Sequence, residues 1–341
     1  MQTQMADDLR QLMRDILEAV GTPAEAAQVV GDSLVDANLA GHDSHGVIRI
    51  LHYVEMVRAG EVFPGMVPAV IATDGATAKI EGGWGWGQLS MLLATETAID
   101  LAREFGLGAA VVRNSYHIGR VAPYVERIAH VGMIGLATSN AGRAAAPYGA
   151  KDRVMGTNPI AWAVPRDDGK APICLDVATS SVAEGKLRVA RAKGEAIAPG
   201  LILNSDGRSS VDPNDFYNGG ALLPFGTHKG SGFSILAQLI GVGLAEAHPD
   251  ILSVKRGGNG PFVLAMDIER FRPLEAFLGA VEDQAEEVNN AAPAEGFDRV
   301  LLPGEIELEH RERRVAEGIP VPDRTWEEIT ALAADLGVIS A

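Results

Sequence analysis

The stretch "GAAVVRNSYHIGRVAPYVERIAH" (residues 108–130) decides the fold class. It places a short apolar run, typical of a strand, before a polar loop, and the apolar residues after the loop recur at helical spacing. Beyond Gly60, short β-branched runs alternate with helical patterns in the same way. This alternation predicts α/β organisation.

The same two patterns locate the other elements. Strands are predicted at residues 77–80, 109–112, 133–138, 160–164, 173–177 and 262–268. Helices are predicted at residues 9–20, 22–40, 44–60, 88–105, 120–130, 182–192, 231–247, 274–289, 308–317 and 325–336. We expect Thr22 to cap the helix 22–40 and Gly41 to end it, and we expect the polar stretch 203–220 to be a surface loop.

The composition bounds the class of protein. A chain of 341 residues has room for two domains, because single cores stop growing at roughly 250 to 300 residues. A formal net charge of −16 argues against a nucleic-acid partner, which requires a basic surface. The single cysteine, Cys174, excludes an intrachain disulfide and fits a reducing compartment. No signal-peptide pattern opens the chain, and the longest apolar stretch (233–247) is too short to cross a bilayer, so we expect a cytoplasmic protein without a membrane partner.

Two histidine-containing stretches carry candidate chemistry. His117 lies in the loop after a predicted strand, where α/β proteins usually bind ligands. His45, in "GHDSHG", opens the helix predicted at 44–60. That helix would bring His45, Arg49 and Tyr53 to one side, because they stand at positions i, i+4 and i+8.

Three hypotheses remain open on the residues alone. In the first, a histidine acts as a general acid and Arg49 holds a substrate carboxylate, as reduction of a 2-oxo acid would require. In the second, a metal site for hydrolysis is formed by His42, Asp43, His45 and His117. In the third, the chain is a binding or assembly protein whose polar clusters are structural.

Two further stretches suit an anionic ligand. "ICLDVATSS" (173–181) brings small residues to the end of a strand, where exposed N–H groups favour an anion. "FGTHKGSGF" (225–233) puts His228 and Lys229 before a helix, and Lys229 suits a phosphate. The chain contains no GxGxxG, and the run "GGWGWGQ" (82–88) misses that spacing. A bound nucleotide would therefore not sit at an ordinary Rossmann turn.

Six motifs, in order, resemble those of the malate/L-lactate dehydrogenase family of nicotinamide-dependent oxidoreductases, which is unrelated to the Rossmann-type enzymes. They are "AGHDSHGVIRI" (40–50), "NSYHIGRVAPY" (114–124), "GTNPIAWAVP" (156–165), "LDVATSSVAEGK" (175–186), "GTHKGSGF" (226–233) and "LLPGEIE" (301–307). The chain looks most similar to the hydroxycarboxylate dehydrogenase branch of this family, whose members also include ureidoglycolate dehydrogenase and 2,3-diketogulonate reductase.

The resemblance implies an α/β fold distinct from the Rossmann fold. A mixed sheet would bind the nicotinamide cofactor, and a helical subdomain would be formed by both chain ends. We expect residues 1–75 plus 270–341 to form the mainly helical domain and residues 76–269 to form the α/β cofactor-binding domain. The resemblance also implies a homodimer whose subunits share the active site.

The matching motifs carry over the family's site residues. His45 and His117 are both candidates for proton transfer, since different members use one or the other. Arg49 would hold the substrate carboxylate, and Tyr53 would line the same pocket. The implied cofactor is NAD, with NADP as the alternative, and no metal is implied. The implied cofactor contacts are Gly119, Arg120, Val121, Cys174, Leu175, Asp176, Val177, Ala178, His228, Lys229, Asn259, Gly304, Glu305, Ile306 and Glu307.

The implied reaction interconverts a 2-oxo acid and a 2-hydroxy acid on a small carboxylate substrate. Reduction of a cyclic imino acid, of the Δ1-piperideine- or Δ1-pyrroline-2-carboxylate type, is the alternative. Reduction of a 2-oxo acid builds negative charge on the carbonyl oxygen, and an imidazolium would stabilise that charge and deliver the proton. Arg49 offers a planar fork that matches a carboxylate.

Overall fold

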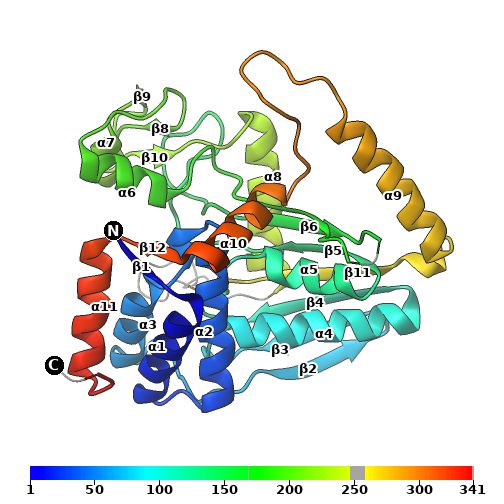
Figure 1. Cartoon of the computed structure of the whole chain (residues 1–341), viewed down its shortest axis with the longest axis horizontal. Helices are drawn as coiled ribbons and strands as arrows, with labels where there is room; N and C mark the ends of the chain where they lie inside the picture. Colours follow the sequence, from blue (N-terminus) through cyan, green and yellow to red (C-terminus); the bar gives the residue numbers. More distant parts are fainter. Residues whose placement is uncertain (168, 246–257, 340–341) are drawn as a thin grey trace.

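The computed structural model describes residues 1–167, 169–245 and 258–339. Figure 1 shows helices from both chain ends gathered on one side, a sheet with its covering helices beside them, and a smaller lobe above. The expected α/β fold with a helical subdomain formed by both ends is confirmed. None of the helices in the described part of the chain is long and apolar enough to cross a membrane.

Within the described residues, the central sheet has seven strands in the order β2-β3-β4-β11-β5-β6-β7. They are β2 (Ala69–Asp74), β3 (Thr77–Glu81), β4 (Leu107–Arg113), β5 (Met133–Thr138), β6 (Ile160–Val164), β7 (Ile173–Val177) and β11 (Phe262–Asp267). Only β3 and β4 run parallel, and the other neighbours are antiparallel, so the sheet is mixed and not of the Rossmann type.

The predicted strands are all present, but β2 was not predicted. All six of its residues are exposed, so the alternation of buried and exposed positions that marks a strand is missing. It pairs with β3 at the edge of the sheet, with a shift of register between Val70 and Ala72. An irregular register is a common protection of an edge strand.

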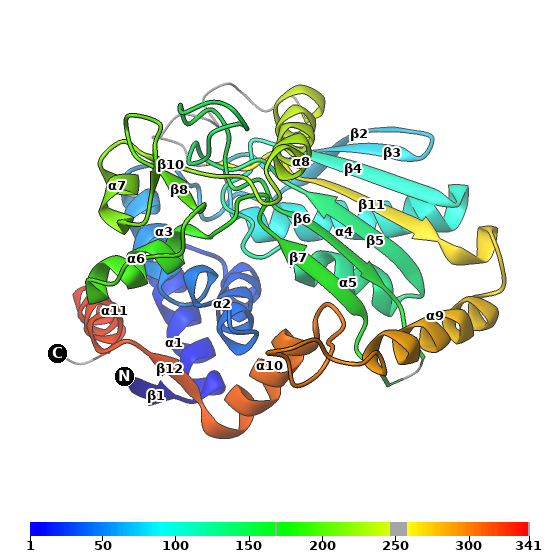
Figure 2. The ribbon, with the colours of Figure 1, turned by 90° about the horizontal axis from the view of Figure 1, so that it is seen from above.

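Two helices, α4 (Gly87–Phe105) and α5 (Ala122–His130), cover one face of the sheet, as the view in Figure 2 shows. The strands present small buried side chains to them, which allows close packing; examples are Ala78, Ala110, Ala137, Ala161 and Ala265. Gly108 on β4 is the tightest point, because a Cβ there would lie 2.0 Å from the carbonyl oxygen of Ala98 on α4.

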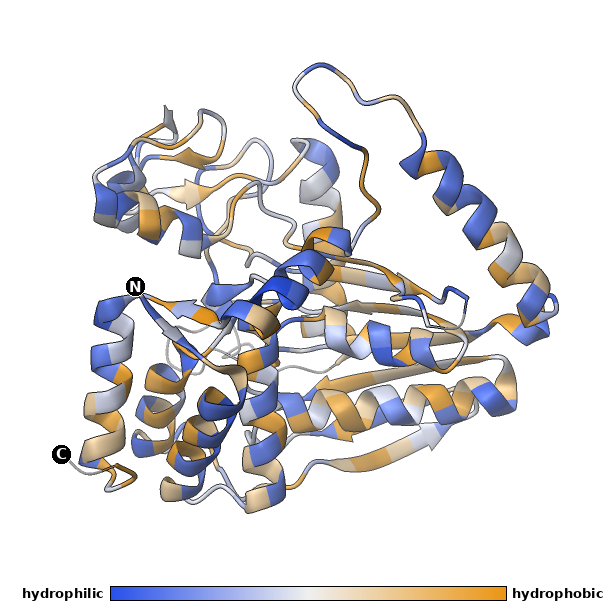
Figure 3. Ribbon diagram, in the orientation of Figure 1, coloured by the Kyte–Doolittle hydropathy of each residue, from blue (hydrophilic) through white to orange (hydrophobic). Residues whose placement is uncertain are grey.

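The helical subdomain brings the two ends of the chain together. Its helices are α1 (Ala6–Ala19), α2 (Ala24–Leu39), α3 (Arg49–Arg58) and α11 (Asp323–Asp335). Strand β1 (Gln2–Gln4) pairs with β12 (Ile319–Val321), which fixes the N-terminus against the C-terminal segment. Figure 3 shows hydrophobic stripes along α1, whose Leu9, Met13 and Ile16 are fully buried.

Two predictions for the N-terminal helices are wrong. Thr22 does not cap α2; its hydroxyl accepts a hydrogen bond from Trp86 Nε1 at 3.2 Å, and Pro23 precedes the helix. The helix predicted at 44–60 is broken into a 3-10 turn, η1 (Asp43–His45), and α3. Gly41, with φ +84°, does follow the end of α2.

The smaller lobe has a core of its own, formed around Leu187, Phe216 and Leu222. Its elements are α6 (Glu184–Lys193), β8 (Ile202–Leu203), β9 (Ser209–Ser210), α7 (Pro213–Tyr217) and β10 (Ala221–Leu222). The prediction of a surface loop at 203–220 is therefore wrong in part. The elements there are too short for a periodic pattern, although Asp212 caps α7 by accepting a hydrogen bond from Asn214 N.

Of three C-terminal helices, α9 (Leu274–Asn289) has its predicted bounds, whereas α8 (His228–Leu239) and α10 (Glu305–Glu317) begin earlier than predicted. Helix α8 begins three residues early and continues as the π-helical segment η2 (Ile240–Leu244), while the predicted end at residue 247 lies outside the described residues. Helix α10 also begins three residues before its prediction. The first turns of α8 and α10 are polar, so hydrophobic periodicity does not reveal them.

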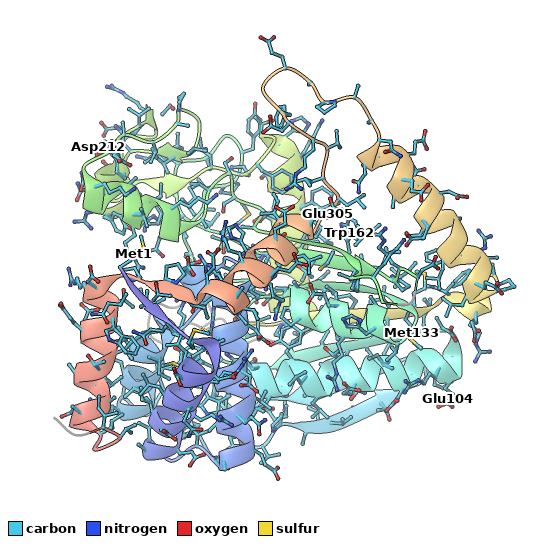
Figure 4. The ribbon with its side chains drawn as sticks, viewed as in Figure 1. Met1, Glu104, Met133, Trp162, Asp212 and Glu305 are labelled. Carbon is cyan, nitrogen blue, oxygen red and sulfur yellow. The ribbon has the colours of Figure 1, made fainter. Side chains whose placement is uncertain are left out.

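Helix α9 stands away from the N-terminal helices, beside the β6–β7 edge (Figure 2). Glu282 anchors it, because its carboxylate accepts hydrogen bonds from Arg166 and Lys170, which lie between β6 and β7. A mostly apolar groove of about 320 Å³ separates α9 from the sheet, and Trp162 of β6, labelled in Figure 4, lies on its wall.

Candidate active site

The turn that holds His45 is fixed from two sides. Asp43 accepts hydrogen bonds from Arg314 of α10, at 2.6 and 3.2 Å, and from Asn38 Nδ2 at 2.6 Å. Asn38 Oδ1 accepts from Val47 N, and a Cβ at Gly46 would lie 2.1 Å from that oxygen. The chain therefore folds around the Asn38 side chain, which is why no continuous helix runs from Ser44.

Four predicted site residues come together. The rings of His45 and His117 stack with centroids 5.6 Å apart, and the Tyr53 hydroxyl lies 2.7 Å from His117 Nδ1. Arg49 Nε donates to the carbonyl oxygen of Ser44 at 2.7 Å, which places the guanidinium beside the turn. The group thus forms by contact between η1, α3 and the β4–α5 loop, and the predicted single helix face is wrong.

The loop carrying His117 is held by Asn259 and packs against Gly87. Asn259 Oδ1 accepts from Ile118 N at 3.2 Å, and Asn259 Nδ2 donates to the carbonyl oxygen of Asn140 at 2.6 Å. Gly87, at the start of α4, lies directly beneath the loop, where a Cβ would stand 2.5 Å from the carbonyl oxygen of His117. Asn259 is a predicted cofactor contact, yet its Oδ1 is engaged with this loop and its Nδ2 with Asn140.

Sequence reasoning missed Gln88. Its Nε2 donates to the Tyr53 hydroxyl at 2.9 Å, so it stands directly behind the Tyr53–His117 pair. Gln88 is 1% exposed, and its Oε1 has no partner among the described residues. The run "GGWGWGQ" does carry a signal, because its glycines end at a polar residue at the start of a helix, although it misses the GxGxxG spacing.

Burial sets the protonation of this group. It lowers the pKa of His45 to about 3 and the pKa of His117 well below 6.5, and the charge of Arg49 lowers both further. Burial also raises the pKa of Tyr53 to about 12. At neutral pH both rings are therefore uncharged in the ligand-free protein, which favours a neutral imidazole over the expected imidazolium as the proton donor.

Several donor atoms of the group are left for a ligand. Within residues 1–167, 169–245 and 258–339, no hydrogen bond engages Nε2 of His45, Nε2 of His117, or the two Nη atoms of Arg49. Both histidines and Arg49 are partly exposed, whereas Tyr53 is buried. A planar cationic fork and imidazole nitrogens side by side can bind a carboxylate and an adjacent carbonyl oxygen.

The segments 174–178 and 304–307, both predicted cofactor contacts, lie side by side. Cys174 N donates to the carbonyl oxygen of Pro303 at 3.1 Å, and a Cβ at Gly304 (φ +97°) would stand 3.2 Å from the carbonyl oxygen of Cys174. Figure 4 labels Glu305, the first residue of α10. A left-handed glycine here brings the helix start against β7.

Asp176 of β7 is engaged with the histidine loop. Its Oδ2 accepts from Val121 N at 2.9 Å and from Ala122 N at 2.8 Å, so it caps α5 from another element. This cap explains why α5 begins at Ala122 and not at the predicted Arg120. The two N–H groups are consequently not free for a phosphate.

Arg120 is the residue best suited to an anion in this region. It is 7% exposed, and its Nε has no partner within the described part of the chain. Its charge contributes to the lowered pKa of His45, after burial and Arg49, and to that of Glu307, after the hydrogen bond with His42. A buried guanidinium without an anion is costly, so these residues fit a group that brings one, such as the pyrophosphate of a nicotinamide dinucleotide.

His228 and Lys229 form a separate part of the predicted site. Both are exposed in the first turn of α8, and the ring of Tyr148 meets His228 edge-on at 6.0 Å. No contact within the described residues joins either of them to His45 or His117. Their place at a helix start suits a phosphate.

The geometry does not favour the metal hydrolase. Asp43 is paired with Arg314, and His42 Nε2 lies 3.3 Å from Glu307 Oε1. Throughout the described residues, no three side chains of histidine, cysteine, aspartate or glutamate are grouped so that they would hold a metal ion.

Comparison with known proteins shows that the whole chain is similar to dehydrogenases and related reductases. The family model described as malate/L-lactate dehydrogenase matches residues 5–330. A Pyrococcus abyssi protein named malate dehydrogenase is 36% identical over 97% of this chain and 94% of its own length. A Pseudomonas syringae protein named Δ1-pyrroline-2-carboxylate/Δ1-piperideine-2-carboxylate reductase is 31% identical over 97% of this chain and 96% of its own. The solved structure of sulfolactate dehydrogenase from Methanocaldococcus jannaschii superposes with a TM-score of 0.91, at 31% identity over 98% of both chains.

Proposed function

We propose, since this chain belongs to the malate/L-lactate dehydrogenase family, that it interconverts a 2-oxo acid and a 2-hydroxy acid with a nicotinamide cofactor. The observation that carries the proposal is the group formed by His45, His117 and Arg49, whose outward nitrogen atoms have no partner within the described residues. Such a set binds a carboxylate and the neighbouring oxygen of a 2-oxo acid.

Arg49 binds the carboxylate of the substrate, and His117 donates the proton to its carbonyl oxygen. The two Nη atoms of Arg49 hold the carboxylate, because its Nε is already engaged with the Ser44 carbonyl oxygen. His117 Nε2 then donates its hydrogen to the carbonyl oxygen, since Nδ1 of the same ring is turned to Tyr53. His45, stacked on His117, borders the same oxygen and shields it from water.

The residues that would hold the cofactor are on β7, at the start of α10 and at the start of α8. Arg120 would pair with one charge of the pyrophosphate, the backbone of residues 174–178 and 304–307 would line the cofactor, and Lys229 with His228 would meet the second pyrophosphate charge. When bound, the nicotinamide supplies the hydride. We favour NAD over NADP and place the reaction in the cytoplasm, where the single buried cysteine stays reduced.

The pH dependence of reduction reports the protonation of the histidines. Both pKa values are lowered, so the neutral rings prevail at every pH above those low values. We therefore expect kcat/KM for reduction to stay level between about pH 6 and 8. If the donor were an imidazolium of ordinary pKa, kcat/KM would instead fall about tenfold per pH unit above that pKa. A falling limb centred near pH 6.5 in steady-state assays would contradict the neutral donor.

We also propose that the protein is a homodimer. The face of the sheet opposite α4 and α5 exposes Leu107 (41%) and Leu136 (36%), and α8 exposes Phe233 (50%), Leu236 (52%) and Leu239 (63%). Apolar surface of this kind is typical of subunit interfaces. The groove beside α9 adds to it.

Light scattering during gel filtration should give twice the chain mass for the wild type. The double substitution Leu236→Asp and Leu239→Asp should shift the protein toward a monomer, because charges are costly in a buried interface. Val315→Asp, at an exposed position of α10, is the matched control. A monomeric wild type at micromolar concentration would end the dimer proposal.

The proposed function is tested by one panel. Purified protein is assayed with NADH and with NADPH against short, branched and dicarboxylic 2-oxo acids and against Δ1-piperideine- and Δ1-pyrroline-2-carboxylate. Turnover of one or more 2-oxo acids is expected. Turnover of the cyclic imines alone would make the chain an imino acid reductase, and no turnover of either class would remove the proposal.

A further inference from the structure

The Tyr53 hydroxyl stands between two nitrogen atoms. Gln88 Nε2 lies 2.9 Å from it and His117 Nδ1 lies 2.7 Å from it, and all three side chains meet below the exposed edge of the site. An amide NH2 only donates, so the Tyr53 oxygen accepts from Gln88. The single hydroxyl hydrogen is then left for His117 Nδ1.

With Gln88 Nε2 facing Tyr53, as in the structure, the opposite tautomer of His117 leaves a buried donor without a partner. If His117 Nδ1 carried the hydrogen, the Tyr53 oxygen would accept from both sides and its own hydrogen would have no acceptor. Leaving a buried donor unsatisfied costs about 1 to 3 kcal/mol. The backbone N–H of Gly119 also points to Nδ1, at 3.4 Å, and favours the same answer, because it too can only donate.

We propose that Gln88 is a positioning residue that fixes, through Tyr53, the neutral tautomer of His117 with its hydrogen on Nε2. This tautomer turns a donor toward the substrate oxygen and keeps the acceptor, Nδ1, toward Tyr53. The proposal deepens the proposed function, since it names what orients the proton donor of the same site.

The arrangement also supplies the proton without charging the ring. The hydrogen on His117 Nε2 moves to the substrate oxygen, which breaks an N–H bond and forms an O–H bond. At the same time the Tyr53 hydrogen moves to His117 Nδ1, which breaks an O–H bond and forms an N–H bond. The negative charge moves from the substrate oxygen to the Tyr53 oxygen. There the Gln88 N–H donates to it and Arg49 is the nearby cation. The transfer runs downhill, because a phenol is a stronger acid than an alcohol.

We expect Gln88→Glu to reverse the relay, that is, the hydrogen bonds that run from residue 88 through Tyr53 to His117. When ionised, the carboxylate introduced by this substitution accepts the Tyr53 hydrogen, so the Tyr53 oxygen accepts from Nδ1–H and Nε2 becomes an acceptor. When protonated, the same carboxyl donates as the amide does. The titratable and charged groups around it are Arg49 and His52 from α3, His45 from η1, His117, Tyr116 and Tyr124.

The direct test is nitrogen NMR of the full chain with selectively ¹⁵N-labelled histidine, with the His117 signals assigned by their loss in His117→Asn. The wild type should show a protonated, pyrrole-like Nε2 and a pyridine-like Nδ1. In Gln88→Glu the two should exchange at neutral pH. Ser90→Ala, equally buried at the same helix start but outside the relay, should keep the wild-type pattern.

Kinetics give the second readout. Gln88→Glu should lower kcat by about 10² at neutral pH, the scale of general acid catalysis, and recover activity as pH falls through the pKa of the new carboxyl. A wild-type His117 with its hydrogen on Nδ1 would overturn the proposal without any variant. Because the tautomer is read without substrate, an inactive protein with the predicted tautomer would count against the proposed function alone.

Discussion

His117→Ala should lower kcat for 2-oxo acid reduction by about 10² or more, the usual contribution of a positioned acid. His117 is the one imidazole of the pair whose Nδ1 is fixed by a buried hydroxyl, at 2.7 Å from Tyr53. Removal of the ring leaves an open space between the substrate oxygen and Tyr53, so no positioned donor contacts that oxygen. The loss should fall on kcat and kcat/KM together, because the hydrogen bond strengthens as charge develops.

Steady-state kinetics of purified variants check this result. His130→Ala, at the exposed end of α5, is the matched control and should keep wild-type turnover. His45→Ala should also be impaired, since its ring stacks on His117 and excludes water from the same oxygen. Near-normal turnover in both His45→Ala and His117→Ala would remove the proposed proton transfer altogether.

Arg49→Ala should raise the KM for the 2-oxo acid roughly 10- to 100-fold, which corresponds to the loss of hydrogen bonds to a charged group. Both Nη atoms are free for the carboxylate, and among the described residues no cation forms a hydrogen bond with His45 or His117. Arg49→Lys should recover little, because an ammonium cannot form the planar two-point contact. The affinity for the cofactor should change little.

A measurement of KM for the acid and of cofactor binding by fluorescence separates these effects. Arg58→Ala is the control from the same helix, where the guanidinium makes an exposed ion pair with Asp335. Arg49 also lowers the pKa of both histidines, after burial, so its removal should move the acid limb of the pH profile upward. An unchanged KM would reassign Arg49 to holding the turn through Ser44.

The strands of the sheet could be predicted well from the sequence. β5, β6 and β7 lie at their predicted bounds, because each is a short apolar run between turns. β2 could not be predicted, since both of its faces are exposed. The order of the strands, with β11 between β4 and β5, depends on long-range pairing that no local pattern contains.

The sequence predicts which residues form the site, but not which contacts bring them together. Helical spacing put His45 over Arg49, yet Asn38 and Gly46 break that helix, and His45 meets His117 only because η1 packs against the β4–α5 loop. Gln88 and Arg314 escaped prediction for a related reason. Each acts through contacts with residues far away in the chain, and neither stands in a recognisable spacing.

Transfer of hydride from the cofactor to a 2-oxo acid in this site can be followed with a deuterium label. The purified protein is incubated with a 2-oxo acid that it turns over and with reduced nicotinamide cofactor carrying deuterium at C4, and the product is analysed by mass spectrometry and proton NMR. We expect a 2-hydroxy acid with one deuterium bound at C2. If neither of the two C4 epimers of the labelled cofactor gives a product with deuterium at C2, direct hydride transfer is contradicted.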